Sequence, residues 1–275
     1  MRHLVNIERY LERIGYFGGR EPSAENLAAL LRAHRVAVPY ETLDLWRGVR
    51  TSLELDALYE KIVVRRRGGY CLELSGLFAA LLRELGYEVR EYEGRWLWSN
   101  SSLPVPRRCH RVVCARVGEG PAKIVDAGVG LPCLTEPLEV VLDKPQLCGG
   151  RYYRLVRDGR LGIVVEMMRP DGAWERLFSF DTAPCEPTDF DYPHWWCQTH
   201  PDSVFRRVFR VFRLTAEGGW KEILGEPRPA AGEPLRATFV ACDASGVGRR
   251  TELADETAFK AALSADFGID EPFLI

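Results

Sequence analysis

A cysteine at the start of an amphipathic helix constrains this chain more than any other feature of its sequence. After Cys71, leucine and phenylalanine recur at three- and four-residue intervals, at positions 74, 77, 78, 81, 82 and 85. This spacing predicts a helix with one buried face that ends near Gly86. Upstream, Gly68 and Gly69 interrupt the apolar segment, because a glycine pair does not propagate a helix well. We therefore expect Cys71 at the N-terminus of the helix.

The surroundings predicted for Cys71 favour a reactive thiol. Unpaired amide groups and the helix dipole favour an anion at a helix N-terminus, so they lower the pKa of a thiol there. Arg65, Arg66 and Arg67 add positive potential, and the glycine pair would let backbone approach the sulfur closely. The alternative is a cysteine that only fills space in the core, which is the usual role of a free cysteine.

Composition and charge describe an ordinary globular protein and argue against several classes of partner. Of 275 residues, 46% are hydrophobic and 28% are charged, and 37 basic against 39 acidic residues give a net charge of −2. This balance favours neither nucleic acid nor an anionic membrane as a partner. The N-terminus lacks an apolar signal segment, and no apolar run approaches the roughly 18 residues of a membrane span. We therefore expect a cytoplasmic protein.

The cysteines predict neither a disulfide framework nor a metal site. Eight cysteines are scattered along the sequence without a Cys-x-x-Cys pair. In a chain without a secretion signal, we expect them to be reduced thiols. Cys109, His110 and Cys114 come closest to a metal cluster, but their spacing fits no familiar zinc pattern and no second pair follows. We therefore predict that no metal is bound.

The first 86 residues are predicted to be mainly helical. Asn6 can cap a first helix that ends near Gly15, and Ser23 opens a second helix. Residues 36–45 are too short and too interrupted by proline for a helix, so we expect a connecting segment there. Ser52 is predicted to cap a third helix that leads into the segment carrying Cys71.

After Gly86 the apolar residues alternate with polar ones, which is typical of strands. Strands are expected at 87–98, 110–117, 123–126, 152–156, 162–168 and 174–180. Residues 87–190 are therefore predicted to form a β-barrel or sandwich. Residues 191–275 are predicted to be mixed, with strands at 204–214, 220–224 and 235–242 and a closing helix at 255–267.

An activated thiol needs a base within hydrogen-bond reach, and the base needs a group that orients it. Histidines occur at positions 3, 34, 110, 194 and 200. His110 begins a predicted strand whose hairpin partner ends in Asp126, whereas His34 is expected to be a helix-face residue without a chemical role. A tight hairpin would place His110 and Asp126 on opposite faces of the sheet. The pair therefore requires a bulge or a shifted register, and the alternative for Asp126 is a surface turn.

The order of cysteine, histidine and acid is that of papain-like thiol enzymes, so it predicts acyl transfer through a thioester on Cys71. In order and spacing, the sequence around these residues resembles the arylamine N-acetyltransferase family. The matching segments cover nearly the whole chain: YLERIGY at 10–16, VPYETLD at 38–44, RGGYCLE at 67–73, HRVV at 110–113, IVDAGVG at 124–130, THPDSVF at 199–205 and FGI at 267–269.

The resemblance implies an α+β fold with three domains. These are an N-terminal helical bundle (1–86), a central antiparallel β-barrel (87–190) and a C-terminal α/β lid (191–275), with a papain-like triad at their junction. It also implies a ping-pong reaction in which the co-substrate acetyl-CoA acetylates Cys71 and an arylamine or hydrazine then accepts the acetyl group. In this reaction Cys71 is the nucleophile, His110 the general base and acid, and Asp126 the residue that orients His110.

The resemblance also assigns supporting roles. Arg67 and Glu41 match positions that form an ion pair beside the triad. Gly128 and Gly130 follow a strand, where their backbone amides would be available to the phosphates of the coenzyme.

A weakly basic acceptor is expected on chemical grounds that do not depend on the family. An alkylamine with a pKa near that of lysine, about 10.4, is roughly 99.9% protonated at pH 7 and cannot attack a thioester, whereas an arylamine or hydrazine is largely neutral. Tyr40 and Phe205 match aromatic pocket positions of the family, where they would stack on an aromatic acceptor. The alternative for each is plain core packing.

Four positions depart from the family pattern: Ser75, Ala127, Val129 and His194. Val129 stands where the family has phenylalanine, so the predicted acceptor pocket is larger and the choice of amine stays open. Three alternatives to the transferase therefore remain: an amide synthase of the same fold that acts on a biosynthetic acyl thioester, a thiol hydrolase, and a binding module without activity.

Overall fold

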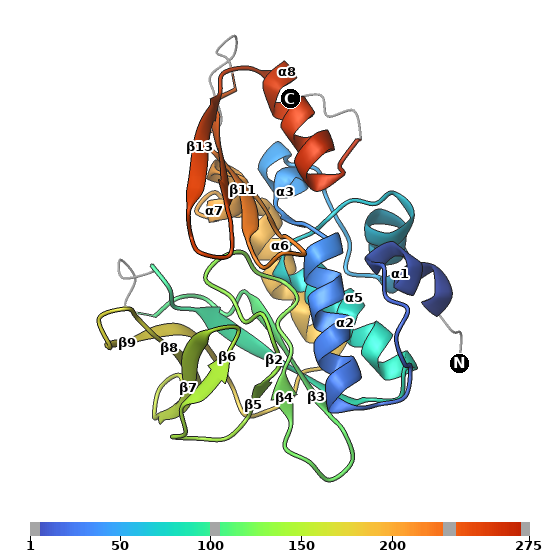
Figure 1. Ribbon diagram of the computed structural model, residues 1–275, viewed down its shortest axis with the longest axis vertical. Coiled ribbons are helices and arrows are strands. Elements are labelled where there is room, and N and C mark those ends of the chain that lie inside the picture. Colours follow the sequence, from blue (N-terminus) through green and yellow to red (C-terminus); the bar gives the residue numbers. More distant parts are fainter. Residues whose placement is uncertain (1–5, 100–104, 228–234, 271–275) are drawn as a thin grey trace.

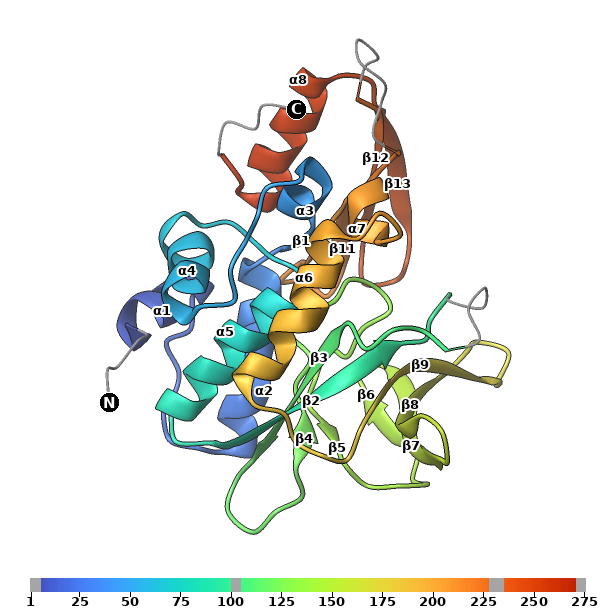
Figure 2. The same cartoon turned by 180° about the vertical axis from the view of Figure 1, so that it is seen from behind.

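A group of helices, an eight-stranded sheet and a five-stranded sheet surround a common centre in the computed structural model (Figure 1, Figure 2). The structure describes residues 6–99, 105–227 and 235–270, so His3 lies outside the described residues. In the part of the chain that is described, none of the helices combines the length and the apolar character needed to cross a membrane.

The first part of the chain is helical, as its apolar periodicity predicts. Its helices are α1 (Ile7–Ile14), α2 (Ala24–Ala37), α3 (Leu43–Arg47), α4 (Leu55–Tyr59), which continues as a π-helix over Glu60–Val64, and α5 (Cys71–Glu84). Asn6 and Ser23 cap α1 and α2 as predicted, because their side chains accept backbone amides in the first turn. The predicted cap of α4 was wrong, since the Ser52 hydroxyl accepts the Glu54 amide in a turn before the helix begins.

Residues 36–45 are not the plain connecting segment that the sequence predicts. Helix α2 continues to Ala37, and strand β1 (Tyr40–Glu41) follows Pro39. Strand β1 pairs antiparallel with β10 (Arg210–Leu214), and the Glu41 amide donates to the Gly69 carbonyl at 2.8 Å. These tertiary partners make a strand of a segment too short to show any periodicity of its own.

Eight antiparallel strands form a nearly closed, barrel-like sheet in the order β5-β4-β3-β2-β9-β8-β7-β6. Their bounds are β2 (Glu88–Trp96), β3 (His110–Arg116), β4 (Lys123–Ile124), β5 (Leu138–Glu139), β6 (Gln146–Cys148), β7 (Arg151–Asp158), β8 (Gly162–Met168) and β9 (Trp174–Phe180). A side chain joins the two edge strands, because the Gln146 amide accepts the Glu139 N–H at 3.0 Å and donates to the Glu139 carbonyl at 2.9 Å. The six strands predicted here are confirmed, whereas β5 and β6 are too short to alternate visibly.

The last part of the chain forms a five-stranded sheet in the order β1-β10-β11-β12-β13, with helices beside it. Its further elements are α6 (Asp191–Thr199), which follows a 3₁₀ turn at Pro187–Phe190, α7 (Val204–Arg207), β11 (Trp220–Gly225), β12 (Ala237–Cys242), β13 (Gly248–Leu253) and α8 (Glu256–Ala262), which continues as a π-helix over Leu263–Phe267. The predicted strand at 204–214 was wrong in its first half. The Ser203 hydroxyl donates to the Cys197 carbonyl at 2.7 Å, which ties the start of α7 to α6 instead.

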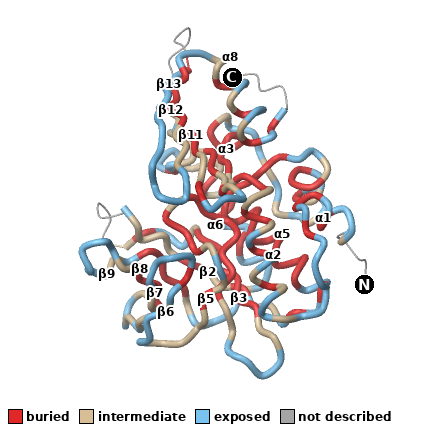
Figure 3. The backbone as a smooth tube through the Cα atoms, viewed as in Figure 1, coloured by how far each residue is buried: buried red, intermediate tan, exposed pale blue. Residues whose placement is uncertain are grey.

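Helix α5 and strand β3 lie at the centre of the molecule. Every residue from Cys71 to Leu82 is buried, as are the first six residues of β3, and Figure 3 shows these buried segments where the helices and the two sheets meet. Strand β1 comes from the helical part of the chain but belongs to the five-stranded sheet. The division at residues 86 and 190 stays a prediction, and β1 is a strand that crosses it.

Candidate active site

Cys71 is the first residue of α5, as predicted, and its side chain is only 6% exposed. The glycines before it have a different role from the predicted one. A Cβ on Gly68 would lie 2.0 Å from the Pro39 carbonyl oxygen, so this glycine lets the loop pack on the backbone before β1. The glycine that approaches the cysteine is Gly128, where a Cβ would lie 2.7 Å from the Cys71 Cα.

The predicted pair of base and acid is present in the structure. The distance between His110 Nε2 and Asp126 Oδ2 is 3.1 Å, and the two side chains are 2% and 1% exposed. A carboxylate only accepts hydrogen bonds, so Nε2 carries the proton and Nδ1 of His110 is left as the basic nitrogen. Edge-on contacts with the rings of Trp96 and Phe178, at 5.7 and 5.3 Å between centroids, hold the imidazole plane.

The register between β3 and β4 explains how this pair forms. Cys114 pairs with Ile124, and the Val125 amide donates to the Val113 carbonyl at 2.9 Å. Relative to a tight hairpin, the pairing is therefore shifted by one residue. Because side chains alternate across a strand, this shift turns Asp126 to the face of His110. The shifted register that the sequence analysis required is thus confirmed.

The pKa of the Cys71 thiol is raised, not lowered as predicted. Burial is the largest cause, and the negative charge of Asp126 adds to it, while the amides of Leu72 and Arg111 act in the opposite direction. The thiol donates to the Cys109 carbonyl at 3.3 Å.

The three arginines before Cys71 have other surroundings than predicted. Arg65 and Arg66 are exposed, and Arg67 is paired with two carboxylates, those of Glu41 and Asp44. None of these three arginines is among the main causes of the shifted pKa of Cys71, which burial raises.

The acid is stabilised in its ionised form. Burial alone would raise the pKa of Asp126, but the charge and hydrogen bond of His110, the charge of Arg35 and the amide of Gly128 together lower it below its usual value. The site therefore holds a neutral thiol beside an ionised carboxylate and an imidazole.

The three predicted substrate-binding residues gather with the cysteine. Tyr40, Val129 and Phe205 belong to one apolar cluster with Cys71. The same cluster contains Cys109 and residues for which no role was predicted: Leu45, Leu53, Tyr70, Leu72, Trp96, Leu131, Cys133, Cys185, Phe190, Trp196 and Cys197. The aromatic members come from all three parts of the chain, for example Tyr70 before α5, Trp96 in β2 and Trp196 in α6. No local pattern of the sequence predicts that they are neighbours.

The two glycines predicted for coenzyme binding lie in tight places. The Gly128 amide donates to Asp126 Oδ1 at 3.1 Å, so it is already engaged within the chain. A Cβ on Gly130 would lie 2.9 Å from the guanidinium carbon of Arg210. A contact between Gly130 and the phosphates of a coenzyme stays a prediction.

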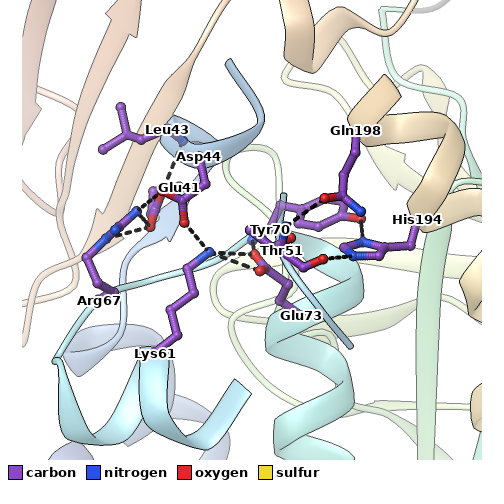
Figure 4. A network of polar contacts seen from close by, with 10 residues as sticks. All are labelled: Glu41, Leu43, Asp44, Thr51, Lys61, Arg67, Tyr70, Glu73, His194 and Gln198. Carbon is purple, nitrogen blue, oxygen red and sulfur yellow. Dashed lines mark hydrogen bonds and ion pairs between the residues drawn. The ribbon is translucent and has the colours of Figure 1, made fainter. Parts of the chain in front are cut away.

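Figure 4 shows a buried ionic network that reaches Glu73 in the first turn of α5. Arg67 Nη2 lies 2.7 Å from Glu41 Oε1, which is the ion pair that the resemblance implies. Lys61 extends the network, with its Nζ 2.9 Å from both Asp44 Oδ2 and Glu73 Oε1. Glu73 also accepts the Tyr70 amide at 3.1 Å, so the network supports the first turn of α5 and with it Cys71.

Two side chains of α6 bind the loop and helix around the cysteine (Figure 4). The His194 Nδ1 atom lies 2.6 Å from the Tyr70 hydroxyl, and its Nε2 lies 3.1 Å from the Thr51 carbonyl. Nε2 therefore donates and Nδ1 accepts. The Gln198 side chain accepts the Thr51 amide at 2.7 Å. His194, which departs from the family pattern, thus connects α6 to the residue before Cys71.

Among the described residues, His34, His194 and His200 do not pair with an acid at this site. His34 is fully buried in the helical core, where its Nδ1 binds the Tyr10 hydroxyl at 3.0 Å. His200 stacks on Trp196 with 5.0 Å between ring centroids. Cys114 lies in the core of the barrel-like sheet, away from the Cys71 cluster, and within residues 6–99, 105–227 and 235–270 no group of three side chains has the arrangement of a metal site. All eight cysteines are free thiols.

Arg35 is a charged residue at the site that no sequence motif predicted. Arg35 in α2 is 4% exposed and donates to the Asp126 carbonyl at 2.7 Å and to the Val129 carbonyl at 2.8 Å. A signal was present, because Arg35 follows Leu27 and Leu31 at four-residue intervals and so occupies a position on the buried stripe of α2.

Comparisons with known proteins extend over most of the chain. A family model described as N-acetyltransferase matches residues 23–270. The chain is 37% identical to an arylamine N-acetyltransferase of Mycolicibacterium smegmatis over 204 residues, which are 73% of this chain and 74% of that protein. The structure of arylamine-N-acetyltransferase from M. tuberculosis has a TM-score of 0.85 at 31% identity and covers 97% of this chain and 93% of that one. For Mycobacterium marinum arylamine N-acetyltransferase in complex with CoA, the TM-score is 0.84 at 30% identity, with 96% and 93% covered.

Proposed function

The chain belongs to the arylamine N-acetyltransferase family and is an enzyme, and on this premise we propose that it moves an acetyl group from acetyl-CoA to an arylamine or hydrazine. The observation that carries the proposal is the buried pair of His110 and Asp126, held against the first turn of α5 by Gly128. A hydrogen-bonded imidazole and carboxylate beside a thiol are the parts that nucleophilic catalysis by cysteine requires.

We propose a ping-pong reaction through a thioester on Cys71. In the first half-reaction, Nδ1 of His110 takes the thiol proton as the sulfur attacks the acetyl carbonyl, and it returns this proton to the departing CoA sulfur. In the second, the amine nitrogen attacks the carbonyl carbon of the acetyl-enzyme and gives a proton to His110. As the bond between this carbon and the Cys71 sulfur breaks, His110 passes the proton to the sulfur, and Cys71 leaves as the thiol. Because burial raises the pKa of Cys71, proton transfer accompanies attack, and the resting thiol is neutral.

Asp126 has the role of orienting the base in this mechanism. By accepting from Nε2, the carboxylate holds His110 in the tautomer whose Nδ1 is basic, and it stabilises the imidazolium formed during each half-reaction. The low pKa of Asp126 keeps this carboxylate ionised at neutral pH. We place the triad at the junction of a helical part (1–86), a barrel part (87–190) and a lid (191–275).

The acceptor is proposed to be an aromatic amine or a hydrazine. The apolar cluster around Cys71 suits a flat ring, with Tyr40 and Phe205 half-buried at its edge. An alkylamine is almost fully protonated at pH 7, so a weakly basic amine, which is largely neutral, is the better nucleophile.

Mass spectrometry of protein exposed to acetyl-CoA tests the proposal. We expect an acetyl adduct on the peptide containing Cys71, absent in Cys71→Ala and in His110→Ala, and rapid loss of the adduct when an arylamine or hydrazine is added. Acetylation of another cysteine would contradict the assigned nucleophile. Loss of the adduct to water at the same rate as to amine would contradict transfer and identify a thiol hydrolase.

A further inference from the structure

The loop after β4 is held by an arginine from a distant part of the chain. The Arg35 guanidinium comes from the last turn of α2, and its Nη1 donates to the Asp126 carbonyl at 2.7 Å while its Nη2 donates to the Val129 carbonyl at 2.8 Å. The Arg35 side chain is buried, so these bonds are shielded from water. A guanidinium is planar and rigid, so two parallel donations fix the relative positions of both carbonyls.

The same loop determines the geometry of the catalytic residues. Its Asp126 carboxylate binds His110 through Oδ2 and the Gly128 amide through Oδ1, both at 3.1 Å. The backbone of Gly128 lies directly against the Cα and carbonyl oxygen of Cys71. A displacement of this loop would therefore change the direction of the imidazole and the packing behind the nucleophile together.

The end of the loop is held from the other side. Arg210 in β10 donates from Nη2 to the Leu131 carbonyl at 3.1 Å, and its Nε binds Glu222. The loop is thus fixed by one arginine from the helical part and by another from the five-stranded sheet. Of these two arginines, it is Arg35 that donates to the Asp126 carbonyl.

We propose that Arg35 is a positioning residue, which through the Asp126 and Val129 carbonyls sets the orientation of the His110 and Asp126 pair toward Cys71. Its catalytic consequence rests on the proposed acyl transfer, whereas its effect on the reactivity of Cys71 does not. Arg35 touches neither the sulfur nor the imidazole, so it acts through the loop and through its charge.

Because Arg35 is charged, its positioning role should also change the pH dependence of Cys71 alkylation. The groups that face Asp126 are His110 on β3, Arg35 on α2, Cys71 on α5 and Cys133 in the following loop. Burial opposes ionisation of Asp126, and the positive charge of Arg35, together with His110 and the Gly128 amide, lowers its pKa. Removal of this charge raises the pKa of Asp126, so the carboxylate becomes protonated at a higher pH as the solution is acidified.

Alkylation of Cys71 by iodoacetamide, followed by peptide mass spectrometry over a range of pH, tests the proposal on the full chain without acetyl-CoA. In Arg35→Met we expect alkylation to be at least about tenfold slower, since misplacement by 1 Å costs up to about 100-fold in reactions of this type. We also expect the decrease of the alkylation rate on the acidic side of its pH profile, here called the acidic limb, to occur at higher pH. Acetyl transfer, measured separately, should fall by a similar factor.

Arg13→Met is the matched control. Arg13 is also buried and also donates only to backbone carbonyls, those of Ile62, Ala37 and Arg66, at 2.9 to 3.2 Å. Its removal leaves the same kind of unpaired carbonyls but does not touch the loop of the acid. We expect the acidic limb of Arg13→Met to match that of the wild type. If Arg35→Met and Arg13→Met gave the same limb and the same rate, the positioning role would be overturned.

Arg35→Lys covers the case in which Arg35→Met does not fold. Lysine keeps the charge but cannot bind both carbonyls with a planar fork. We expect its acidic limb to stay near that of the wild type while alkylation is slower, and a wild-type rate would overturn the proposal. A protein in which Arg35 controls alkylation but no acetyl adduct forms would disprove the proposed function and leave the positioning role intact.

Discussion

The imidazole Nε2 of His110 lies 3.1 Å from Oδ2 of Asp126, and both side chains are almost completely withdrawn from solvent. A buried carboxylate is costly unless it is paired, so this contact stabilises the ionised acid as well as the tautomer of the base. The neighbouring thiol is neutral at rest because burial raises the pKa of Cys71. The site therefore depends on the carboxylate to hold the proton acceptor in place.

Asp126→Asn should leave the fold intact and abolish most of the activity. An amide has nearly the shape of the carboxylate but cannot stabilise the imidazolium, and its nitrogen favours the wrong tautomer. We expect the rate of acetyl transfer to fall by about four orders of magnitude, as for the same change in serine protease triads. Asp171→Asn, in an exposed turn, is the control and should keep the wild-type rate. A loss of less than tenfold in Asp126→Asn would contradict the role of this residue.

Gly128→Ala should damage both stability and reactivity. The new Cβ would lie 2.7 Å from the Cys71 Cα and from the Ser75 hydroxyl oxygen, so backbone must shift. We expect a loss of about 1–3 kcal/mol in the free energy of unfolding, typical of overpacking, together with slower alkylation of Cys71. Gly159→Ala is a suitable control because a Cβ there meets nothing within 4 Å. Unchanged unfolding and alkylation in Gly128→Ala would show that the close approach is not required.

The sequence predicts best those helices and strands that are long enough to show a periodic spacing of apolar residues. Helix α5 has 14 residues, and the strands predicted in the barrel-like sheet have, apart from β4, seven to nine residues. Strand β1 and helix α7 are short. The structure of β1 follows from its pairing with β10, which lies far away in the sequence, and that of α7 from a contact with the preceding helix α6. Local periodicity contains no information on such contacts.

At the candidate site, too, the sequence predicted some features correctly and others wrongly. The sequence identified His110 and Asp126 as a pair, and the structure contains this pair through the shifted register that the alternation of side chains along strands requires. The catalytic roles of Cys71, His110 and Asp126 stay a prediction. The pKa of Cys71 was predicted in the wrong direction. The helix N-terminus is visible in the sequence, but the burial that outweighs it depends on the packing of every other part of the chain.

Stability should fall as the solution is acidified below about pH 6.5, and His34 should account for much of the loss. Burial lowers the pKa of His34 to about 3, and the charges of Arg13 and Arg35 act in the same direction. In the unfolded chain the histidine takes up a proton near pH 6.5, whereas the folded chain stays unprotonated until about pH 3, so protonation favours unfolding within this window. At pH 5 the loss from His34 should be about 2 kcal/mol.

Urea unfolding at pH 7 and pH 5 measures this effect. His34→Gln lowers stability at both pH values but should reduce the difference between them, because the titrating group is gone. His194, whose pKa is also lowered by burial, continues to contribute in the same direction. An unchanged difference in His34→Gln would show that this histidine is protonated in the folded protein.

Lys61→Met should destabilise the protein strongly. Its ammonium lies 2.9 Å from both Asp44 and Glu73, and the three side chains are at most 10% exposed. Removal of Lys61 leaves the buried Glu73 carboxylate without its ammonium partner, while Asp44 stays paired with Arg67. Loss of one partner of a buried ion pair costs about 3–5 kcal/mol in the free energy of unfolding. Lys260→Met, which breaks an exposed pair with Glu256, should cost less than about 1 kcal/mol. Equal losses in the two variants, measured by urea unfolding, would contradict a structural role of the buried network.

Val129→Phe should change which amine is accepted, with little effect on the attack on acetyl-CoA. Val129 is buried in the apolar cluster of Cys71, and its carbonyl is held by Arg35, so a larger side chain must project into the space beside the sulfur. We expect kcat/KM for a bulky bicyclic arylamine to fall at least about tenfold relative to that for a small hydrazine, which is the range of discrimination that a few methylene groups provide.

The rate of acetylation of Cys71, measured by mass spectrometry, should stay within a few-fold of the wild type. Val247→Phe adds the same ring at an exposed position and should leave the ratio unchanged. If both amines slowed equally in Val129→Phe while acetylation did not, Val129 would not border the acceptor, and the size of the acceptor pocket would be determined by other members of the cluster.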